Sequence, residues 1–587
     1  MLYLLALLSA STAAPATPPP VATPIPTAKP LVSTLPVNTQ GLTLPAAPDV
    51  GSDLAVPQET SAPSGDIVGV NQTPFVGISL QDAVAMALAK NSDLIIAQAN
   101  RRIQQYRVVE AQGADDIRLQ IQPTYSYQQQ PVTNAFFAGP DGLPVQQSEL
   151  STTGGFAGET GSGTQYSLTA DAARTDNTTT INGFNPTYTT GFALNVTQPL
   201  LRGAHIDAAR QQLEIATANA QLSSAQLLVD ASNTLVSVLD AYDDLIAAWR
   251  NVAIQEDALR QAKAQSESNE RLVQHGAAAP VDVAEANAQV YTFQGNVFSA
   301  LQNVARLQNQ LKSLTLLDPA DPLWNANLVP TSAPSAIGTE PALTDVIASA
   351  LSNRPELAEV RASRRNADVE LAYARGQIGP QVDLNLNIAE DGFAGAPTNP
   401  ALNPLSVLLP PGIVLPSPPA YETGKLGQAW TNAFAGRFPQ YTLGATIAFP
   451  LQNRAARGAL GAAVEQEKSI DAQQVAVIER IVAEARNAVQ SYRSARARLT
   501  AATAEREAAQ RVLEGEERKF SAGESTTFLV LQREVTLANA RGSEVQAATD
   551  LQEALVELDR VSGSIFTHYS VDVSRLGSGA ADLAPTK

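Results

Sequence analysis

Residues 80–94 read LQDAVAMALAKNSDL, and residues 343–357 read LTDVIASALSNRPEL. The two stretches align without a gap, and Asp82 in the first corresponds to Asp345 in the second. Both predict a short helix. Self-similarity of this kind is the sequence signature of a repeated architecture. We therefore expect the chain to contain the same structural unit twice.

The duplication continues along the chain in the same order. VTQPLLRG at residues 196–203 resembles IAFPLQNR at 447–454, and RLVQHG at 271–276 matches RKFSAG at 518–523. Each half is expected to run through a short helix, a helix, a strand, a loop, a strand, a very long helix, a Gly turn and a helix. The two repeats are predicted at residues 78–338 and 339–566.

Very long helices are the strongest single signal. Residues 204–275 contain neither Gly nor Pro. A seven-residue spacing recurs on three stripes: Leu228, Leu235, Tyr242 and Trp249; Val238, Leu245, Val252 and Leu259; Ile478, Ala485, Tyr492 and Leu499. This spacing keeps a stripe against a neighbouring helix, and two stripes on one helix suggest two neighbours. The rod would be roughly 100 Å long at 1.5 Å per residue. An ordinary dimeric coiled coil has the same periodicity and remains an alternative.

Strands are predicted where apolar and polar side chains alternate, at residues 119–128, 188–197, 381–389 and 441–449. Residues 165–172 are a candidate for an extra strand. Runs of about ten residues suffice for a tilted strand to cross a bilayer, with one face on lipid and the other on a polar lumen. A soluble sheet with one wet face uses the same alternation.

Four strands cannot close a barrel, and an open sheet edge is not viable in lipid. If the strands span a membrane, several chains must share one barrel, and three copies would give twelve strands. In that case the expected fold class is an internally duplicated α+β membrane protein with a long α-helical barrel, in which a trimer with four β-strands per chain would share a 12-stranded barrel. Pro199 and Pro450 mark the strand-to-helix transitions, since Pro is tolerated at the first helical turn.

Composition excludes several functions. The 587 residues carry a formal net charge of −18, no cysteine and three scattered histidines, His205, His275 and His568. Thiolate chemistry, disulfides and a His-rich metal site are therefore not expected, and an acidic chain is a poor binder of nucleic-acid phosphates. We expect no enzyme activity, no cofactor and no metal.

The termini are expected to lie outside the fold. Residues 1–14 resemble a secretory signal peptide, although no basic residue precedes the apolar run. Residues 15–77 form a Pro-rich leader that predicts disorder, with ten prolines between residues 15 and 50. Residues 567–587 are expected to be a C-terminal tail.

Taken together, these residues resemble the TolC-type outer-membrane efflux proteins, over roughly residues 78–566. The motifs that carry the resemblance are the duplicated helix start, Pro-Leu at residues 199–200 and 450–451, and the two Gly-containing hairpin tips. The resemblance implies a homotrimer with a barrel in the outer membrane and a helical tunnel in the periplasm. It also implies a periplasmic adaptor and an inner-membrane pump as partners, and substrates that pass unchanged.

The hairpin tips are the candidate functional residues. Gly276 and Gly523 are expected to end the long helices with positive φ. The resemblance implies that the tips dock the adaptor and close the pore. The docking residues would be Gly276, Ala277, Ala278, Ala279, Pro280, Val281, Gly523, Glu524, Ser525, Thr526, Thr527 and Phe528. Asp282 falls on an acidic position of the family and is also well placed to cap a helix.

The second tip departs from some relatives. Leu529 and Gln532 stand where these carry paired acids, so Glu524 would have to supply an acidic ring instead. Its simpler interpretation is a solvated turn residue. Phe520 occupies the place of a gating tyrosine in some relatives, so a hydroxyl latch is missing there. Farther from the tips, residues 240–244 hold three aspartates, which predict a tunnel band or a solvated helical face.

Two functions compete at this point. The first is an outer-membrane exit channel for tripartite efflux or type I secretion, with passive conduction and gating at the periplasmic tip. The second is a periplasmic or secreted coiled-coil scaffold with a small soluble sheet. The paired strands at matching positions favour the channel, because a scaffold does not need them.

Overall fold

A computed structural model of the chain describes residues 75–131, 143–179, 181–332, 341–398 and 417–573. The expected signal peptide and most of the leader lie outside these residues. The last three leader positions, however, belong to a short strand, β1 (Phe75–Ile78). This strand pairs in parallel with β6 (Asn327–Pro330).

Each repeat begins with two consecutive helices. They are α1 (Leu80–Lys90) and α2 (Ser92–Gln112) in the first repeat, and α5 (Leu343–Asn353) and α6 (Glu356–Gly376) in the second. Ser79 and Asp82 form a capping box at the start of α1, which satisfies backbone N–H groups that no helical partner reaches.

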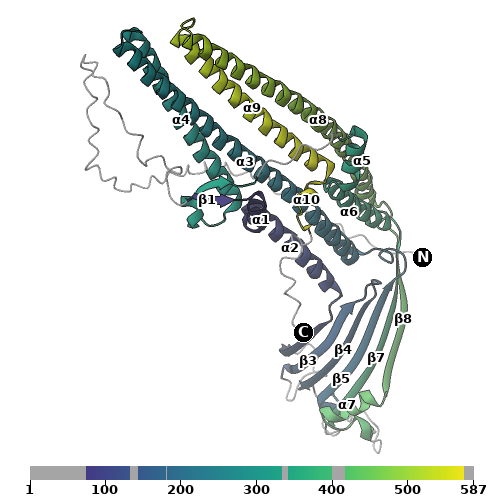
Figure 1. Cartoon of the computed structure of the whole chain (residues 1–587). Coiled ribbons are helices and arrows are strands. Elements are labelled where there is room, and N and C mark those ends of the chain that lie inside the picture. Colours follow the sequence, from purple (N-terminus) through teal and green to yellow (C-terminus); the bar gives the residue numbers. More distant parts are fainter. Residues whose placement is uncertain (1–74, 132–142, 180, 333–340, 399–416, 574–587) are drawn as a thin grey trace, which may run out of the picture. The chain divides into compact units, whose positions relative to one another are not determined.

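Four long helices form two hairpins (Figure 1). The hairpins are α3 (Ala208–Gln274) with α4 (Pro280–Thr315), and α8 (Arg454–Ser521) with α9 (Thr527–Ser562). The 67 residues of α3 give a rod of roughly 100 Å. Helix α3 contacts both α4 and α9, which agrees with the two-stripe prediction.

The largest apolar cluster lies where the first repeat packs around the middle of α3. Leu235, Val238, Tyr242 and Leu245 are buried there together with residues of α1 and α4. The Tyr242 hydroxyl donates to the Ile78 carbonyl at 2.9 Å, and Trp249 Nε1 donates to the Leu328 carbonyl at 3.0 Å. The polar ends of the two aromatic side chains therefore fix the β1–β6 pair against α3.

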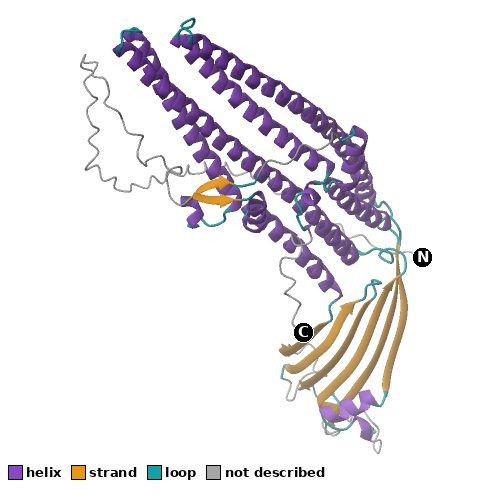
Figure 2. Ribbon diagram, viewed as in Figure 1, coloured by secondary structure: helices purple, strands orange, loops and turns teal. Residues whose placement is uncertain are grey.

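The long strands form one six-stranded antiparallel sheet, drawn in orange in Figure 2 and labelled in Figure 1. Its order is β2-β3-β4-β5-β7-β8. The strands are β2 (Arg118–Gln130), β3 (Val145–Glu159), β4 (Gln165–Asn177), β5 (Phe184–Pro199), β7 (Gln381–Pro397) and β8 (Phe438–Ala448). A nine-residue helix, α7 (Leu426–Phe434), precedes β8.

The expectation of four strands per chain is wrong for this sheet. The candidate strand at 165–172 exists and is longer, as β4, but β3 was not predicted. In β3 most positions on the apolar face hold small or polar side chains: Ser148 precedes Leu150, and Thr152 and Gly154 lie between Leu150 and Phe156. Alternation of hydrophobicity is weak in such a run, so the sequence pattern does not predict a strand there.

The expected tail is also shorter than predicted. A last helix, α10 (Ile565–His568), follows α9. Beyond it, Tyr569 and Val571 still pack against the cluster around α3. The chain is therefore part of the fold for several residues past 566, because apolar residues continue there.

Candidate functional site

The sheet has one polar face. Six residues at the same level of neighbouring strands form a row across it: Arg118, Ala157, Ser167, Asn195, Asn387 and Thr442. Asn387 Nδ2 donates to Asn195 Oδ1 at 2.6 Å, and Asn195 Nδ2 donates to Ser167 Oγ at 3.4 Å. Hydrogen bonds between side chains thus link three strands along this face.

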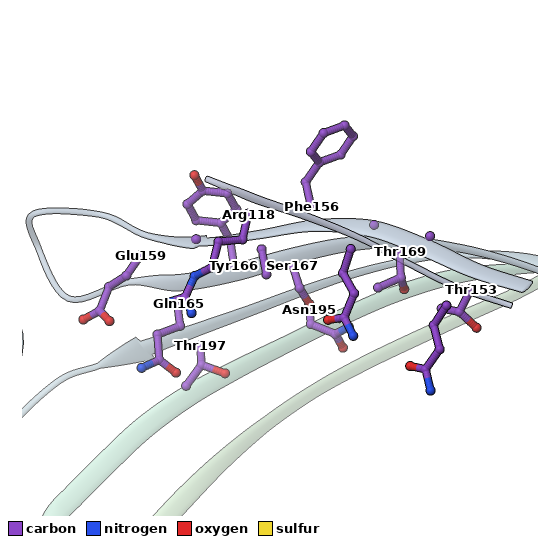
Figure 3. Close-up of a pocket in the computed structure, with 16 residues that line it drawn as sticks. Arg118, Thr153, Phe156, Glu159, Gln165, Tyr166, Ser167, Thr169, Asn195 and Thr197 are labelled. Atoms are coloured by element: carbon purple, nitrogen blue, oxygen red, sulfur yellow. Dashed lines mark hydrogen bonds between the residues drawn. The ribbon is translucent and has the colours of Figure 1, made fainter. Parts of the chain in front are cut away.

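Part of the polar face forms an open depression of about 600 Å³ over β2–β5. In Figure 3, Thr169, Asn195 and Thr197 lie on one side of the sheet, while Phe156 projects from the other. The depression is therefore one section of a hydrated wall, since its floor is lined by hydroxyl and amide groups.

The opposite face of the sheet is apolar at the matching level. The row shifted by one residue consists of Leu119, Phe156, Leu168, Leu194, Ile388 and Tyr441. Leu119, Phe156, Leu168 and Tyr441 are exposed although they are large and apolar. A broad exposed apolar face marks contact with lipid or with another protein.

Helix α7 covers this apolar face at the end of β7 that is farther from α6. Trp430 and Phe434 pack on Phe192, with ring centroids 5.0 and 4.9 Å apart. Asn432 Nδ2 donates to the Phe393 carbonyl at 2.8 Å. The approach requires glycine on the strand, because a Cβ at Gly392 would stand 2.0 Å from the Ala429 carbonyl oxygen.

The first hairpin tip has the expected glycine geometry. Gly276 has φ +71°, and the N–H of Ala277 donates to the Leu272 carbonyl at 2.8 Å. These features define a Schellman-type helix end. The carboxylate of Asp282 accepts from the N–H of Ala279 at 3.0 Å, so it caps the start of α4. Val281, beside it, is 60% exposed.

The second tip repeats this geometry. Gly523 has φ +79°, and the N–H of Glu524 donates to the Lys519 carbonyl at 2.8 Å. Thr526 caps α9 through the N–H of Leu529. Phe528, next to the tip, is 57% exposed.

The predicted residues of the second tip fall into two environments. Glu524 is exposed, whereas Phe520 packs beside a cluster that includes Leu513, Val530 and Leu537. Thr527 is only 8% exposed. Its side chain is therefore unavailable for docking in this arrangement, unlike those of its neighbours in the predicted segment.

Polar contacts join the two hairpins, and sequence reasoning missed the residue at their centre. Asn269 is fully buried. Its Nδ2 donates to the Asp282 carbonyl at 3.1 Å, and its Oδ1 accepts from Thr527 Oγ1 at 3.5 Å. Farther along, Arg541 of α9 pairs with Asp257 of α3 at 2.8 Å. Asn269 follows Ala262 and Ser266 on a buried stripe of α3. A polar residue on a stripe of small, buried residues is the sequence feature that could have identified Asn269.

Glu534 is a second residue that was missed. It lies 7% exposed on α9, on the stripe that continues from Val530 to Leu537. Burial and, secondarily, repulsion from Glu517 raise its pKa to about 7. An acid on an otherwise apolar stripe is again a signal that the sequence contained.

The aspartates of residues 240–244 are half-buried, so they do not form a fully solvated helical face. Burial, followed by repulsion from Glu553 of α9, raises the pKa values of Asp240 and Asp243 to about 7. The same burial raises the pKa of Asp244 above its ordinary value. The band is therefore partly protonated near neutral pH.

The prolines at the transitions stand at the ends of strands and not in helical turns. Pro199 is the last residue of β5 and pairs with Asp383. Helix α3 begins only at Ala208, capped by Asp207. Pro450 follows β8, and α8 begins at Arg454. Proline suits the end of a strand because it cannot donate to a further ladder bond.

Comparison with known proteins follows the same outline. A family model described as outer membrane efflux protein matches residues 160–315 and 346–564. No curated protein sequence matches the chain. Among the described residues, the helices include none with the length and apolarity that crossing a bilayer requires.

Several solved structures share the fold. The outer membrane channel CmeC of Campylobacter jejuni is 15% identical, with a TM-score of 0.57 and coverage of 84% of this chain and 88% of that one. The outer membrane protein VceC of Vibrio cholerae is 16% identical, with a TM-score of 0.55 and coverage of 82% and 96%. The open-state channel MtrE of Neisseria gonorrhoeae is 14% identical, with a TM-score of 0.55 and coverage of 83% and 89%. The fold predicted from the resemblance is therefore confirmed, apart from the number of strands.

Proposed function

This chain belongs to the outer membrane efflux protein family, and we propose that three copies of it form the exit duct of a pump that spans two membranes. Family membership makes it an outer-membrane efflux channel with helices that extend into the periplasm, and not an enzyme. It also removes the coiled-coil scaffold as the competing interpretation. Copy number, partners and gate are the parts that we propose.

The division of the sheet into two faces carries the proposal. The apolar row and the polar row each continue across all six strands. A sheet with this pattern fits a barrel wall between lipid and a water-filled lumen. Solutes would pass along amide and hydroxyl groups without reacting, because the polar face offers hydrogen bonds and no assembled catalytic group.

The two edges of the sheet support closure of the barrel with further copies of the chain. Both β2 and β8 are exposed along nearly all of their residues. Their unpaired backbone groups need partners inside a bilayer. A further copy of the chain provides such a partner, since β8 of one copy is antiparallel to β2 of the next.

The tips are proposed to dock a periplasmic adaptor that connects to an inner-membrane pump. Val281 and Phe528 support this, because each places an exposed apolar side chain beside a Gly turn. Asp282 contributes by holding the start of α4 in place, and Glu524 adds an exposed acid to the second tip. Adaptor contact would shift the tips toward an open arrangement if it bound that arrangement more tightly.

Gating is proposed to separate the two hairpins at the tip. The contacts that would break are Asn269 with Thr527 and Asp257 with Arg541. These contacts join α3 to α9. Phe520 would then act through packing, because it has no hydroxyl to form a latch.

Imaging of the detergent-extracted protein, with its oligomer mass, tests the duct. A trimeric hollow particle with a stalk of roughly 100 Å is expected. A water-soluble monomeric or dimeric rod would contradict the proposal.

Crosslinking tests the docking segments cleanly because the chain has no cysteine. Val281→Cys and Phe528→Cys should crosslink to the periplasmic adaptor in cells, whereas Val475→Cys should not. Val475 is a suitable control because it is equally exposed on α8 and far along the helix from the tip. Adaptor adducts at Val475 alone would overturn the assignment of the tips.

A further inference from the structure

The sheet contains two more strands than a twelve-stranded trimeric barrel would need from each chain. Strands β3 and β4 form a hairpin between β2 and β5. They have 15 and 13 residues, comparable to their neighbours. Strand β3 pairs with β2 from Val145 to Ala157, and β4 pairs with β5 from Gln165 to Thr175. The hairpin is therefore integrated into the sheet on both sides.

The hairpin also continues both faces of the sheet without interruption. On the apolar face, Phe156 and Leu168 stand between Leu119 of β2 and Leu194 of β5. On the polar face, Ser167 accepts a hydrogen bond from Asn195. A hairpin folded outside the barrel wall would place either its apolar face in water or its polar face in lipid.

The turn of the hairpin is fixed at the level where the strands meet the helices. Residues 160–164 close through the N–H of Gly163, which donates to the Thr160 carbonyl at 2.7 Å. Thr164 Oγ1 donates to Gln198 near the end of β5. Gly163 has φ +79°, and a Cβ there would stand 2.8 Å from Asp207 Oδ2. The turn thus packs against the cap of α3, so the hairpin ends where the neighbouring strands end.

The β3–β4 hairpin adds two strands to the sheet but adds no junction between a strand and a helix. Helices α2 and α6 lead into β2 and β7, and β5 and β8 lead into α3 and α8. Within the described part of the sheet, β3 and β4 are the two strands that neither follow nor lead into a helix. The number of strands in the barrel can therefore exceed the number of helices that connect to it.

We propose that three copies of the chain close an eighteen-stranded barrel, in which the β3–β4 hairpins supply the six additional strands. The inference rests on the proposed trimer. Six strands per copy is an even number, so β8 of one copy meets β2 of the next in the antiparallel sense that the other pairs use. Barrel diameter grows roughly in proportion to strand number. The backbone cylinder would measure roughly 36 Å instead of roughly 24 Å for twelve strands, at the usual strand spacing and tilt.

Strand counting in images of the native oligomer tests this directly. Three copies with eighteen strands are expected. Three copies with twelve strands, with the hairpin outside the wall, would overturn the wide barrel and leave the proposed duct intact. An assembly other than a trimer would instead contradict the proposed function, so the two failures are distinguishable.

A deletion variant gives a second readout. Removing residues 145–177 takes out two antiparallel strands and leaves β2 and β5 in the correct relative direction. Polyethylene glycols of graded size, added to the outer side of a planar bilayer, report which polymers enter the barrel and lower its conductance. The largest polymer admitted should fall in diameter by at least about a third in the variant, because the side chains that line the lumen occupy the same depth in both barrels. An unchanged size limit in a folded, trimeric variant would overturn the proposal. If the variant does not assemble, the native strand count decides alone.

Discussion

The two repeats share one helical plan but differ in the sheet. Both contain two short helices, a long helix and its returning partner. The first contributes β2, β3, β4 and β5, whereas the second contributes β7 and β8 and the outer helix α7. Helices that must pack against equivalent neighbours are constrained in their length and in the spacing of their buried apolar residues. A sheet accepts a further hairpin at low cost, because two more antiparallel strands preserve both direction and face.

A second difference lies buried in the turn that follows the first helix of each repeat. Asn91 and Arg354 occupy the same place in the duplicated stretches, and both are almost fully buried. Asn91 caps α2 through the N–H of Asp93 at 2.9 Å. Arg354 instead binds Glu356 and Glu484. One turn is therefore closed by a neutral cap and the other by an ion pair that reaches α8.

The largest expected effect comes from breaking that ion pair. Arg354→Leu should cost about 3–5 kcal/mol, because two carboxylates lose a buried cation. Asn91→Ala should cost only about 1 kcal/mol for the lost cap. Thermal loss of helical circular dichroism in detergent checks both, and Arg354→Leu should melt several degrees lower. Equal losses would show that the two turns do the same work despite their chemistry.

The aspartates of residues 240–244 allow the two repeats to be compared by their dependence on pH. With Tyr242 matched to Tyr492, Asp240 and Asp243 of the first repeat correspond to Gln490 and Arg493 of the second. The folded pKa values of Asp240 and Asp243 are about 7, so the folded protein holds protons that the unfolded chain releases. The contribution of these two carboxyls to stability should therefore be fully present below about pH 4 and be lost as pH rises through 7.

Asp240→Asn should remove part of this pH dependence. The groups around Asp240 are Glu553 and Glu557 of α9 and the neighbouring Asp243 and Asp244, so a neutral amide relieves repulsion. The melting temperature should rise at pH 8 and stay unchanged at pH 4. Gln490→Asp, at the exposed equivalent position, is the control and should show no such trend. A pH-independent effect of Asp240→Asn would contradict the buried, protonated band.

Tyr242→Phe tests how the first repeat is closed. The hydroxyl donates to Ile78 and accepts from the N–H of Ser332 at 3.0 Å. Its loss leaves the half-buried Ser332 N–H without this acceptor, whereas the Ile78 carbonyl still accepts from the N–H of Thr331 at 3.0 Å. The substitution should cost about 1–3 kcal/mol. Tyr291→Phe on the exposed side of α4 is the matched control. Melting temperatures that coincide for the two variants would mean that the bridge adds no stability.

Small effects, alike in the two repeats, are expected at the tips, where the repeats agree. Gly276→Ala and Gly523→Ala should each cost about 1–2 kcal/mol, because both residues have positive φ. A Cβ at either position would meet no neighbouring atom, so no steric clash adds to this cost. Gly295→Ala, inside α4, should have the opposite sign and gain about 0.5–1 kcal/mol. Thermal melts and protease cleavage at the tips measure all three. A much larger loss at one tip would show that the two tips are not equivalent.

Much of the fold was predictable because it repeats or alternates. The duplicated stretches, the long helices and the Gly turns were found from spacing alone, since each position on a stripe is fixed by one neighbouring helix. Strand β3 was missed because Gly154 and Thr152 occupy apolar-face positions that large residues fill elsewhere. Asn269 and Glu534 were missed because a buried polar residue on a helix has the same local sequence as an exposed one.

The sequence by itself determined the repeated plan, the two periodicities and the glycine turns, because backbone geometry and side-chain period are local properties. Only the tertiary structure decided the number of strands, the partners of Arg354 and the contact of Asn269 with α4 and α9. These features depend on residues that are far apart in the chain and come together only in the folded protein. The burial of each charged or polar group by those residues sets the free energy of its ion pair or hydrogen bond.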